Sequence, residues 1–151
     1  MKVLLAIDGT KYAEAARDML KSFSLKGGDS IHVISVVDMA VPLAVEVYGG
    51  YLPDSTELEK NARDFAAKTV EEAADSLKAF FAGVEVTTDI LFGSPGSRIV
   101  ETAEELSTDL IVLGSHGHKR WERLLLGSVS SSVVNHAHCS VLVVRIRETA
   151  A

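Results

Sequence analysis

Residues 113–130 read LGSHGHKRWERLLLGSVS, and the spacing of the glycines in this stretch suggests a binding loop. Gly114 and Gly117 stand three residues apart, and after a longer interval Gly127 is followed directly by Ser128. A helix beginning at Ser128 would present unpaired backbone N–H groups, and glycines would let a phosphate come close to the chain. Turn geometry and close packing could also require these glycines. The stretch therefore predicts either a phosphate-binding loop or a tight structural turn.

The segments on either side of this stretch alternate between strand-like and helix-like patterns. Short apolar, β-branched runs are typical of parallel strands buried on both faces, and the segments between them place apolar residues at helical spacing. This alternation predicts a single α/β domain with a parallel sheet and helices on both faces. The expected strands are residues 3–7, 31–37, 84–92, 109–114 and 140–145, and the expected helices start at Thr10, at Asp54 or Ser55, near Pro95 and at Ser128.

The second of these helices is the longest, running from an N-cap at Asp54 or Ser55 to about Phe80. Its apolar residues recur at helical spacing, which predicts an amphipathic helix with one apolar face. That face consists of Leu58, Ala62, Phe65, Ala73 and Leu77.

The segment before this helix, residues 38–53, reads DMAVPLAVEVYGGYLP and fits neither periodicity. Irregular loops of this length are uncommon in compact domains and are often functional. Its apolar side chains need a cover. We consider a lid over a site, a contact between subunits, and packing against its own domain as alternatives.

The composition narrows the classes of partner. The chain has 151 residues, a formal net charge of −6 and one cysteine, Cys139. An acidic chain without a basic cluster argues against nucleic acid as a partner. No segment has the length of apolar residues that a membrane span needs, and no helix pairs a basic face with bulky apolar residues. A single cysteine allows no intrachain disulfide, so we expect a cytoplasmic protein with a buried thiol.

Several catalytic and metal-binding motifs can be set aside. The common P-loop pattern and the dinucleotide fingerprint are missing from the sequence, and GSVSS is not a serine-hydrolase elbow. The pair His116 and His118 should lie at the opposite end of the sheet from His136 and His138, which argues against a joint metal site. Asp8 follows the first strand without an obvious second carboxylate, so a ligand-binding or helix-capping role is favoured over a general base.

The same stretch resembles the C-terminal signature of the universal stress protein family. Its glycines and serine fit that family's ATP motif, G-x2-G-x9-G-[ST], and four further segments are similar to family elements: LLAIDGT, HVISVVD, GSPGSRIV and DLIVLGSHG. The resemblance covers residues 1–147, with a short tail at 148–151. It implies a three-layer sandwich whose five-stranded parallel sheet has the order 3-2-1-4-5, an adenine nucleotide alpha hydrolase-like or flavodoxin-like layout.

The resemblance also implies where an adenine nucleotide would lie. Asp8 and the backbone of Val36 would hold the adenosine, and Ile7 and Pro95 would line its walls. The ribose and phosphates would be wrapped by the loop after the fourth strand and by the start of the last helix. These two segments contribute Gly114, Ser115, His116, Gly117, Gly127, Ser128, Val129 and Ser130.

The family resemblance implies ATP as the ligand, with Mg²⁺ or Mn²⁺ bridging its phosphates, and a homodimer formed through residues 140–145. No residue is assigned to catalysis, so we expect a regulatory nucleotide-binding protein with slow hydrolysis at most and an unknown protein partner. A nucleotide hydrolase or transferase that uses the same pocket is one alternative. A dimeric scaffold without nucleotide is another.

Overall fold

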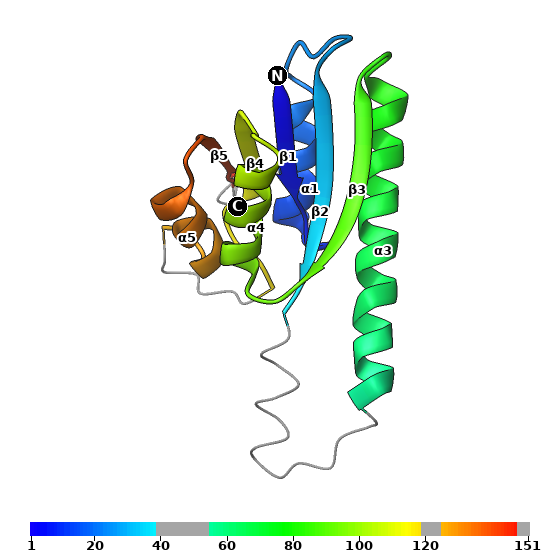
Figure 1. Ribbon diagram of the computed structural model, residues 1–151, viewed down its shortest axis with the longest axis vertical. Helices are drawn as coiled ribbons and strands as arrows, with labels where there is room; N and C mark the ends of the chain where they lie inside the picture. Colours follow the sequence, from blue (N-terminus) through cyan, green and yellow to red (C-terminus); the bar gives the residue numbers. More distant parts are fainter. Residues whose placement is uncertain (39–54, 119–124, 148–151) are drawn as a thin grey trace.

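The computed structural model describes residues 1–38, 55–118 and 125–147. Most of the 38–53 segment, Asp54, Trp121 and the 148–151 tail therefore lie outside the described residues. Strands and helices alternate along the chain (Figure 1). They are β1 Lys2–Ala6, α1 Lys11–Leu20, β2 Ser30–Val37, α3 Ser55–Phe80, β3 Glu85–Phe92, α4 Pro95–Glu105, β4 Leu110–Gly114, α5 Ser128–His136 and β5 Ser140–Val144.

The sheet is parallel, and its strand order is β3-β2-β1-β4-β5, which confirms the expected architecture. The predicted strands differ from the observed ones by at most one residue at each end. Strand β1 lies at the centre, where Ala6 is in register with Ile34 of β2 and Leu113 of β4. The carboxyl ends of these three strands therefore meet at one edge of the sheet.

Two apolar cores lie on opposite faces of this sheet. The core beneath α1 and α3 contains Ala16, Leu20 and Leu77, which are all fully buried. The core beneath α4 and α5 contains Ile99 and Val133. Figure 1 shows the corresponding layers, with α1 and α3 on one side of the sheet and α4 and α5 on the other. In the described part of the chain, no helix has the length and hydropathy of a membrane span.

The apolar face of α3 is buried in the second half of the helix and largely exposed in the first half. Leu77 is buried, but Leu58 is 37% exposed and Phe65 is 53% exposed. The first half of α3 extends beyond the sheet in Figure 1, so less of the sheet lies beneath it. Helical spacing predicts which residues share a face, but it does not indicate where the surface beneath them ends.

Candidate functional site

A cavity of about 490 Å³ lies where the carboxyl ends of the central strands meet. Strand β1 lies between β2 and β4. Successive strands are therefore added toward one edge of the sheet from β1 to β3 and toward the other edge from β4 to β5. Ligands of open α/β sheets bind in such a crevice. The volume falls within the roughly 300–1,000 Å³ typical of small-molecule sites.

The cavity brings together nearly all the residues that the sequence nominated. Of that set, only Ser115 is absent from its wall. The nominated residues that line it are Ile7, Asp8, Val36, Pro95, Gly114, His116, Gly117, Gly127, Ser128, Val129 and Ser130.

Ser115 lies behind the cavity wall and supports the loop. Its side chain is almost fully buried, at 1% exposure. Its carbonyl oxygen accepts a hydrogen bond from the backbone N–H of Gly127 at 2.7 Å and another from the hydroxyl of Ser130 at 2.9 Å. Ser115 thus ties the start of the loop to the start of α5, and the hydroxyl of Ser130 points at this carbonyl.

The three glycines of the motif have different structural surroundings. A Cβ added to Gly114 would lie 2.7–2.8 Å from atoms of Tyr12, so this glycine lets α1 pack directly on the end of β4. A Cβ on Gly127 would lie 3.1 Å from the carbonyl oxygen of Ser115. A Cβ on Gly117 would lie 3.1 Å from Oδ2 of Asp8. Packing alone therefore explains Gly114, whereas Gly117 and Gly127 keep the loop closely folded beside the cavity.

Asp8 organises the turn between β1 and α1. Its Oδ1 accepts hydrogen bonds from the backbone N–H of Thr10 at 3.0 Å and from the Thr10 hydroxyl at 2.6 Å. Thr10 in turn is the N-cap of α1 and accepts from the N–H of Ala13. One oxygen of the carboxylate is thus engaged in the helix cap, while the other faces the Gly117 backbone. This arrangement agrees with the capping interpretation of Asp8.

Two helix N-termini face the cavity. Helix α5 begins after Gly127, which provides no side-chain cap, and the first turn of the helix contains no acidic residue. Helix α4 begins after Ser94, whose side chain makes no cap hydrogen bond, and its first turn also contains no acidic residue. Each N-terminus carries a partial positive charge and N–H groups without an intrahelical acceptor. The cavity can therefore attract an anion although the chain as a whole is acidic.

The rest of the cavity is largely apolar. Side chains from the ends of the strands and from α4 form this part, and it suits a flat, uncharged ring system better than a charged group. They include Ala6, Ile34, Val36, Ile99 and Leu113.

Four polar residues of the cavity wall were not nominated from the sequence: Asp38, Ser94, His118 and Ser132. Asp38 follows β2 as Asp8 follows β1, so the rule on carboxyl ends could have found it. Ser94 could have been inferred as the N-cap before Pro95. Ser132 reaches the cavity because α5 packs closely on α4, with the Ser132 hydroxyl 2.7 Å from where a Gly96 Cβ would lie. No pattern in the sequence signals that contact.

The histidines make separate contacts. His116 shares a 2.9 Å hydrogen bond between its Nδ1 and the Ser115 hydroxyl, while His118 bonds to the carbonyl of Asp8. His136 bonds to a carbonyl within its own helix. Across residues 1–38, 55–118 and 125–147, no group of three or more His, Cys, Asp or Glu side chains is placed to hold a metal ion. The cations Lys119, Arg120 and Arg123 lie outside the described residues.

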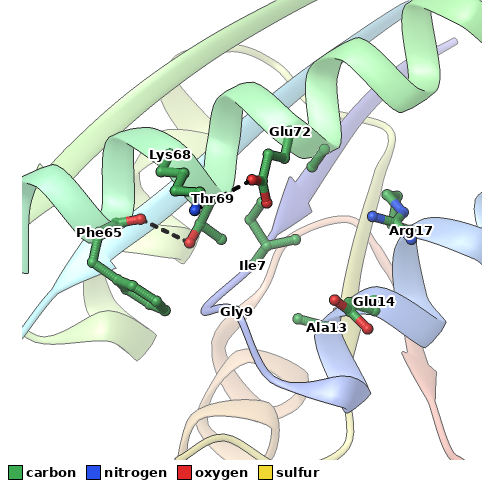
Figure 2. Close-up of a pocket in the computed structure, with 10 residues that line it drawn as sticks. Ile7, Gly9, Ala13, Glu14, Arg17, Phe65, Lys68, Thr69 and Glu72 are labelled. Carbon is green, nitrogen blue, oxygen red and sulfur yellow. Dashed lines mark hydrogen bonds and ion pairs between the residues drawn. The ribbon is translucent and has the colours of Figure 1, made fainter.

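A second, smaller hollow of about 190 Å³ lies between α1 and α3, and it shares Ile7 and Ala13 with the main cavity (Figure 2). Charged side chains on its rim make local pairs: Lys68 lies 3.8 Å from Glu72 on α3. The hollow is lined by the first turns of α1, where Glu14 places an acidic side chain.

Cys139 lies just before β5, where it is partly buried against the core beneath α5. Burial raises the pKa of its thiol, which lowers the thiolate fraction and hence the reactivity at neutral pH. The expectation of a buried thiol is thus met in part, because Cys139 has intermediate exposure.

Comparison with known proteins identifies the family. The sequence profile of the universal stress protein family matches residues 1–145. The chain belongs to the universal stress protein family. It is 33% identical over 144 residues to universal stress protein MJ0531 from Methanocaldococcus jannaschii, covering 95% of this chain and 81% of that protein. It is 35% identical over 148 residues to a Staphylococcus aureus (strain USA300) protein named for the same family, covering 97% and 84%.

Solved structures share the fold of this universal stress protein. Hypothetical protein MJ0577 superposes with a TM-score of 0.82 at 29% identity, covering 98% of this chain and 97% of that one. An Arabidopsis thaliana family member with AMP bound superposes with a TM-score of 0.68 at 14% identity, covering 97% and 92%. A universal stress protein in complex with cAMP gives 0.57 at 22% identity, covering 95% of each chain. At these last two identities the likeness concerns the fold alone.

Proposed function

We propose that this universal stress protein binds ATP in the 490 Å³ cavity and acts as a nucleotide-dependent regulator. One observation carries the proposal: a single cavity combines an apolar region with the N-terminus of α5, which bears no acid in its first turn. An adenine nucleotide has the same two parts, because a flat base is joined to a chain of negatively charged phosphates.

Each part of the nucleotide has a matching part of the cavity. The base would lie against Val36 and Pro95, with Asp8 near the ribose. The phosphates would lie where Gly117 and the first turn of α5 leave backbone N–H groups exposed. Ser128 is exposed at that turn, so its hydroxyl is available as a further donor. The AMP and cAMP carried by the two family structures are ligands of the same chemical class.

Magnesium or manganese would accompany the triphosphate. Such ions commonly bind through phosphate oxygens and water, with one or two carboxylates at most. Among the described residues of the cavity wall, the carboxylates are those of Asp8 and Asp38. The cation would neutralise charge on the phosphates, and the residues present suit it as a partner of the nucleotide rather than as a separately held ion.

We expect slow hydrolysis at most. Hydrolysis requires a positioned water and stabilisation of charge on the transferred phosphoryl group. Oδ1 of Asp8 is engaged by the N–H and hydroxyl of Thr10, and we assign no described residue of the cavity wall to position the attacking water. Turnover should therefore fall far below the median of about 10 s⁻¹ for enzymes.

The proposal includes a homodimer formed through β5. Among the described strands, this one pairs with β4 alone and lies at an edge of the sheet. Its sequence, SVLVV, carries no charge that would discourage pairing with another chain. The first residue of the loop after β4 bonds to this strand, since the N–H of Ser115 donates to the carbonyl of Val144 at 2.9 Å. Nucleotide at the loop would thereby influence the dimer edge.

The test is a calorimetric titration with MgATP, supported by the fluorescence of Trp121, the only tryptophan. Ser128→Asp places a negative charge at the α5 N-terminus, where it favours the helix but repels phosphate. We expect this substitution to raise the Kd for MgATP at least about tenfold, which corresponds to about 1.4 kcal/mol. Ser128→Asn is the uncharged control and should stay within about threefold of wild type.

Equal Kd values for the two variants would contradict a phosphate site at α5. A flat wild-type titration, with equilibrium dialysis to detect silent binding, would contradict ATP binding and favour a nucleotide-free dimeric scaffold. Many turnovers of ATP in a phosphate-release assay would favour the nucleotide hydrolase or transferase.

A further inference from the structure

We propose that His118 is a positioning residue that fastens the phosphate loop to the turn between β1 and α1, with Phe65 of α3 packed behind it. The inference rests on the proposed nucleotide function and assigns a role in it to two side chains, one of which lies outside the cavity. It concerns the residues that keep Gly117 and its neighbours where phosphates would bind.

The first contact is a hydrogen bond between residues distant in the sequence. Nε2 of His118 lies 2.6 Å from the backbone carbonyl oxygen of Asp8. A carbonyl oxygen can only accept, so Nε2 must carry the proton and donate it. The bond joins the loop after β4 to the turn after β1, directly next to the position at which Gly117 faces Oδ2 of Asp8.

The second contact braces the imidazole from α3. The ring centroids of His118 and Phe65 lie 6.4 Å apart at an interplanar angle of 60°. The Phe65 ring also covers Gly9: a Cβ added there would lie 2.6 Å from Cζ of Phe65. Figure 2 shows Phe65 reaching from α3 toward Gly9. Phe65 is 53% exposed and adds little to the core, and this contact supplies a reason for a large apolar side chain at that place.

The two contacts of His118, with the Asp8 carbonyl and with Phe65, are together called the latch. The geometry predicts which part of a bound nucleotide depends on it. His118 and Gly117 adjoin the phosphate end of the cavity, whereas Val36 and Pro95 form the end proposed for the base. Loosening His118 would let the Gly117 backbone move away from Asp8 and from the phosphates. The apolar end would stay intact, because the contacts of His118 described above do not involve its residues. Loss of the latch should therefore weaken binding of ATP and leave binding of adenosine nearly unchanged.

A direct contact between His118 and a phosphate would produce part of the same effect. Phe65 distinguishes the two explanations, because it lines the hollow between α1 and α3 and is not part of the main cavity wall. Only the positioning role predicts that Phe65→Ala weakens MgATP binding. Phe80→Ala is the matched control: Phe80 is on the same helix at 55% exposure but at the opposite end.

The experiment measures the Kd of MgATP and of adenosine by calorimetry. One hydrogen bond is worth about 0.5–1.5 kcal/mol, so His118→Ala should raise the Kd of MgATP by about 2- to 10-fold. Adenosine should change by less than about twofold. His118→Gln retains an N–H donor without a titratable ring and should restore most of the MgATP affinity. Phe65→Ala should weaken MgATP by about 2- to 5-fold.

His138→Ala serves as the histidine control, because His138 is exposed at the amino end of β5, away from the cavity. Circular dichroism of every variant reports whether the fold is retained. The latch is overturned if His118→Ala or Phe65→Ala binds MgATP as wild type does, or if adenosine weakens in parallel. Wild-type protein that binds no nucleotide would instead overturn the proposed function itself, and the latch with it.

Discussion

At the scale of single residues, Gly114 shows that a glycine in a binding motif can be required by packing. The nearest neighbours of an added Cβ would be the backbone carbon, the backbone oxygen and the Cβ of Tyr12, all within 2.8 Å. Backbone atoms cannot turn aside as the end of a flexible side chain can. The first glycine of the motif therefore sets the distance between α1 and β4, and it would be needed even in the absence of a ligand.

Gly114→Ala should accordingly lower the free energy of unfolding by about 1–3 kcal/mol, the usual cost of overpacking. Gly27→Ala is the control, because its nearest neighbour would be the Gly83 carbonyl oxygen at an ordinary 3.9 Å. That variant should stay within about 0.5 kcal/mol of wild type. Urea denaturation measures both. Equal stabilities for Gly114→Ala and Gly27→Ala would show that α1 can shift at little cost.

At the scale of elements, α3 divides into two halves with different surroundings. The second half packs on β2 and β3 and buries Val70, Ala73 and Leu77. The first half carries Leu58 and Phe65 with substantial exposure. One continuous helix therefore combines a part that stabilises the core with a part that reaches the turn at Gly9.

Leu77→Ala should cost about 2–5 kcal/mol of unfolding free energy, since the side chain is fully buried and leaves a cavity. Phe65→Ala should cost about 1 kcal/mol or less, because half of the ring is already in water. Thermal and urea unfolding of the two variants provide the comparison. If Phe65→Ala were as damaging as Leu77→Ala, the first half of α3 would have to belong to the core.

At the scale of the whole molecule, the sheet has two edges of different character. Strand β3 carries Glu85 and Asp89 among its exposed residues, and such charges discourage pairing with another strand. Strand β5 offers Val141, Leu142 and Val143, which are only partly buried. The contrast favours β5 as the edge that pairs in the proposed homodimer.

Val141→Lys places a charge on the β5 edge and should convert a dimer of wild-type protein into a monomer. Phe80→Lys, which replaces an exposed apolar residue on α3, should leave the dimer unchanged. Light scattering coupled to size-exclusion chromatography measures the mass, and circular dichroism checks that the monomer is folded. A wild-type monomer, or a Val141→Lys dimer, would contradict pairing through β5.

Much of the fold and of the candidate site could be predicted because both depend on local patterns. Apolar runs such as residues 31–37 are long enough to mark a buried strand, and their alternation with helical segments requires parallel strands and crossovers. Carboxyl ends of parallel strands share one edge, which allowed the stretch that begins at Gly114 to be assigned to a binding edge. The resemblance to the universal stress protein family added Asp8 and Val36 to the same site. Spacing alone left a structural turn as an alternative, and the resemblance favoured the nucleotide-binding interpretation.

The three-dimensional packing decided the rest, because contacts between distant segments leave no periodic trace in the chain. It placed Ser115 behind the cavity wall, set Tyr12 against Gly114, and left Phe65 exposed on the apolar face of α3. It also joined His118 to the carbonyl of Asp8, 110 residues away. Each of these outcomes depends on where one element ends relative to another, which is a property of the assembled sheet and its two helix layers.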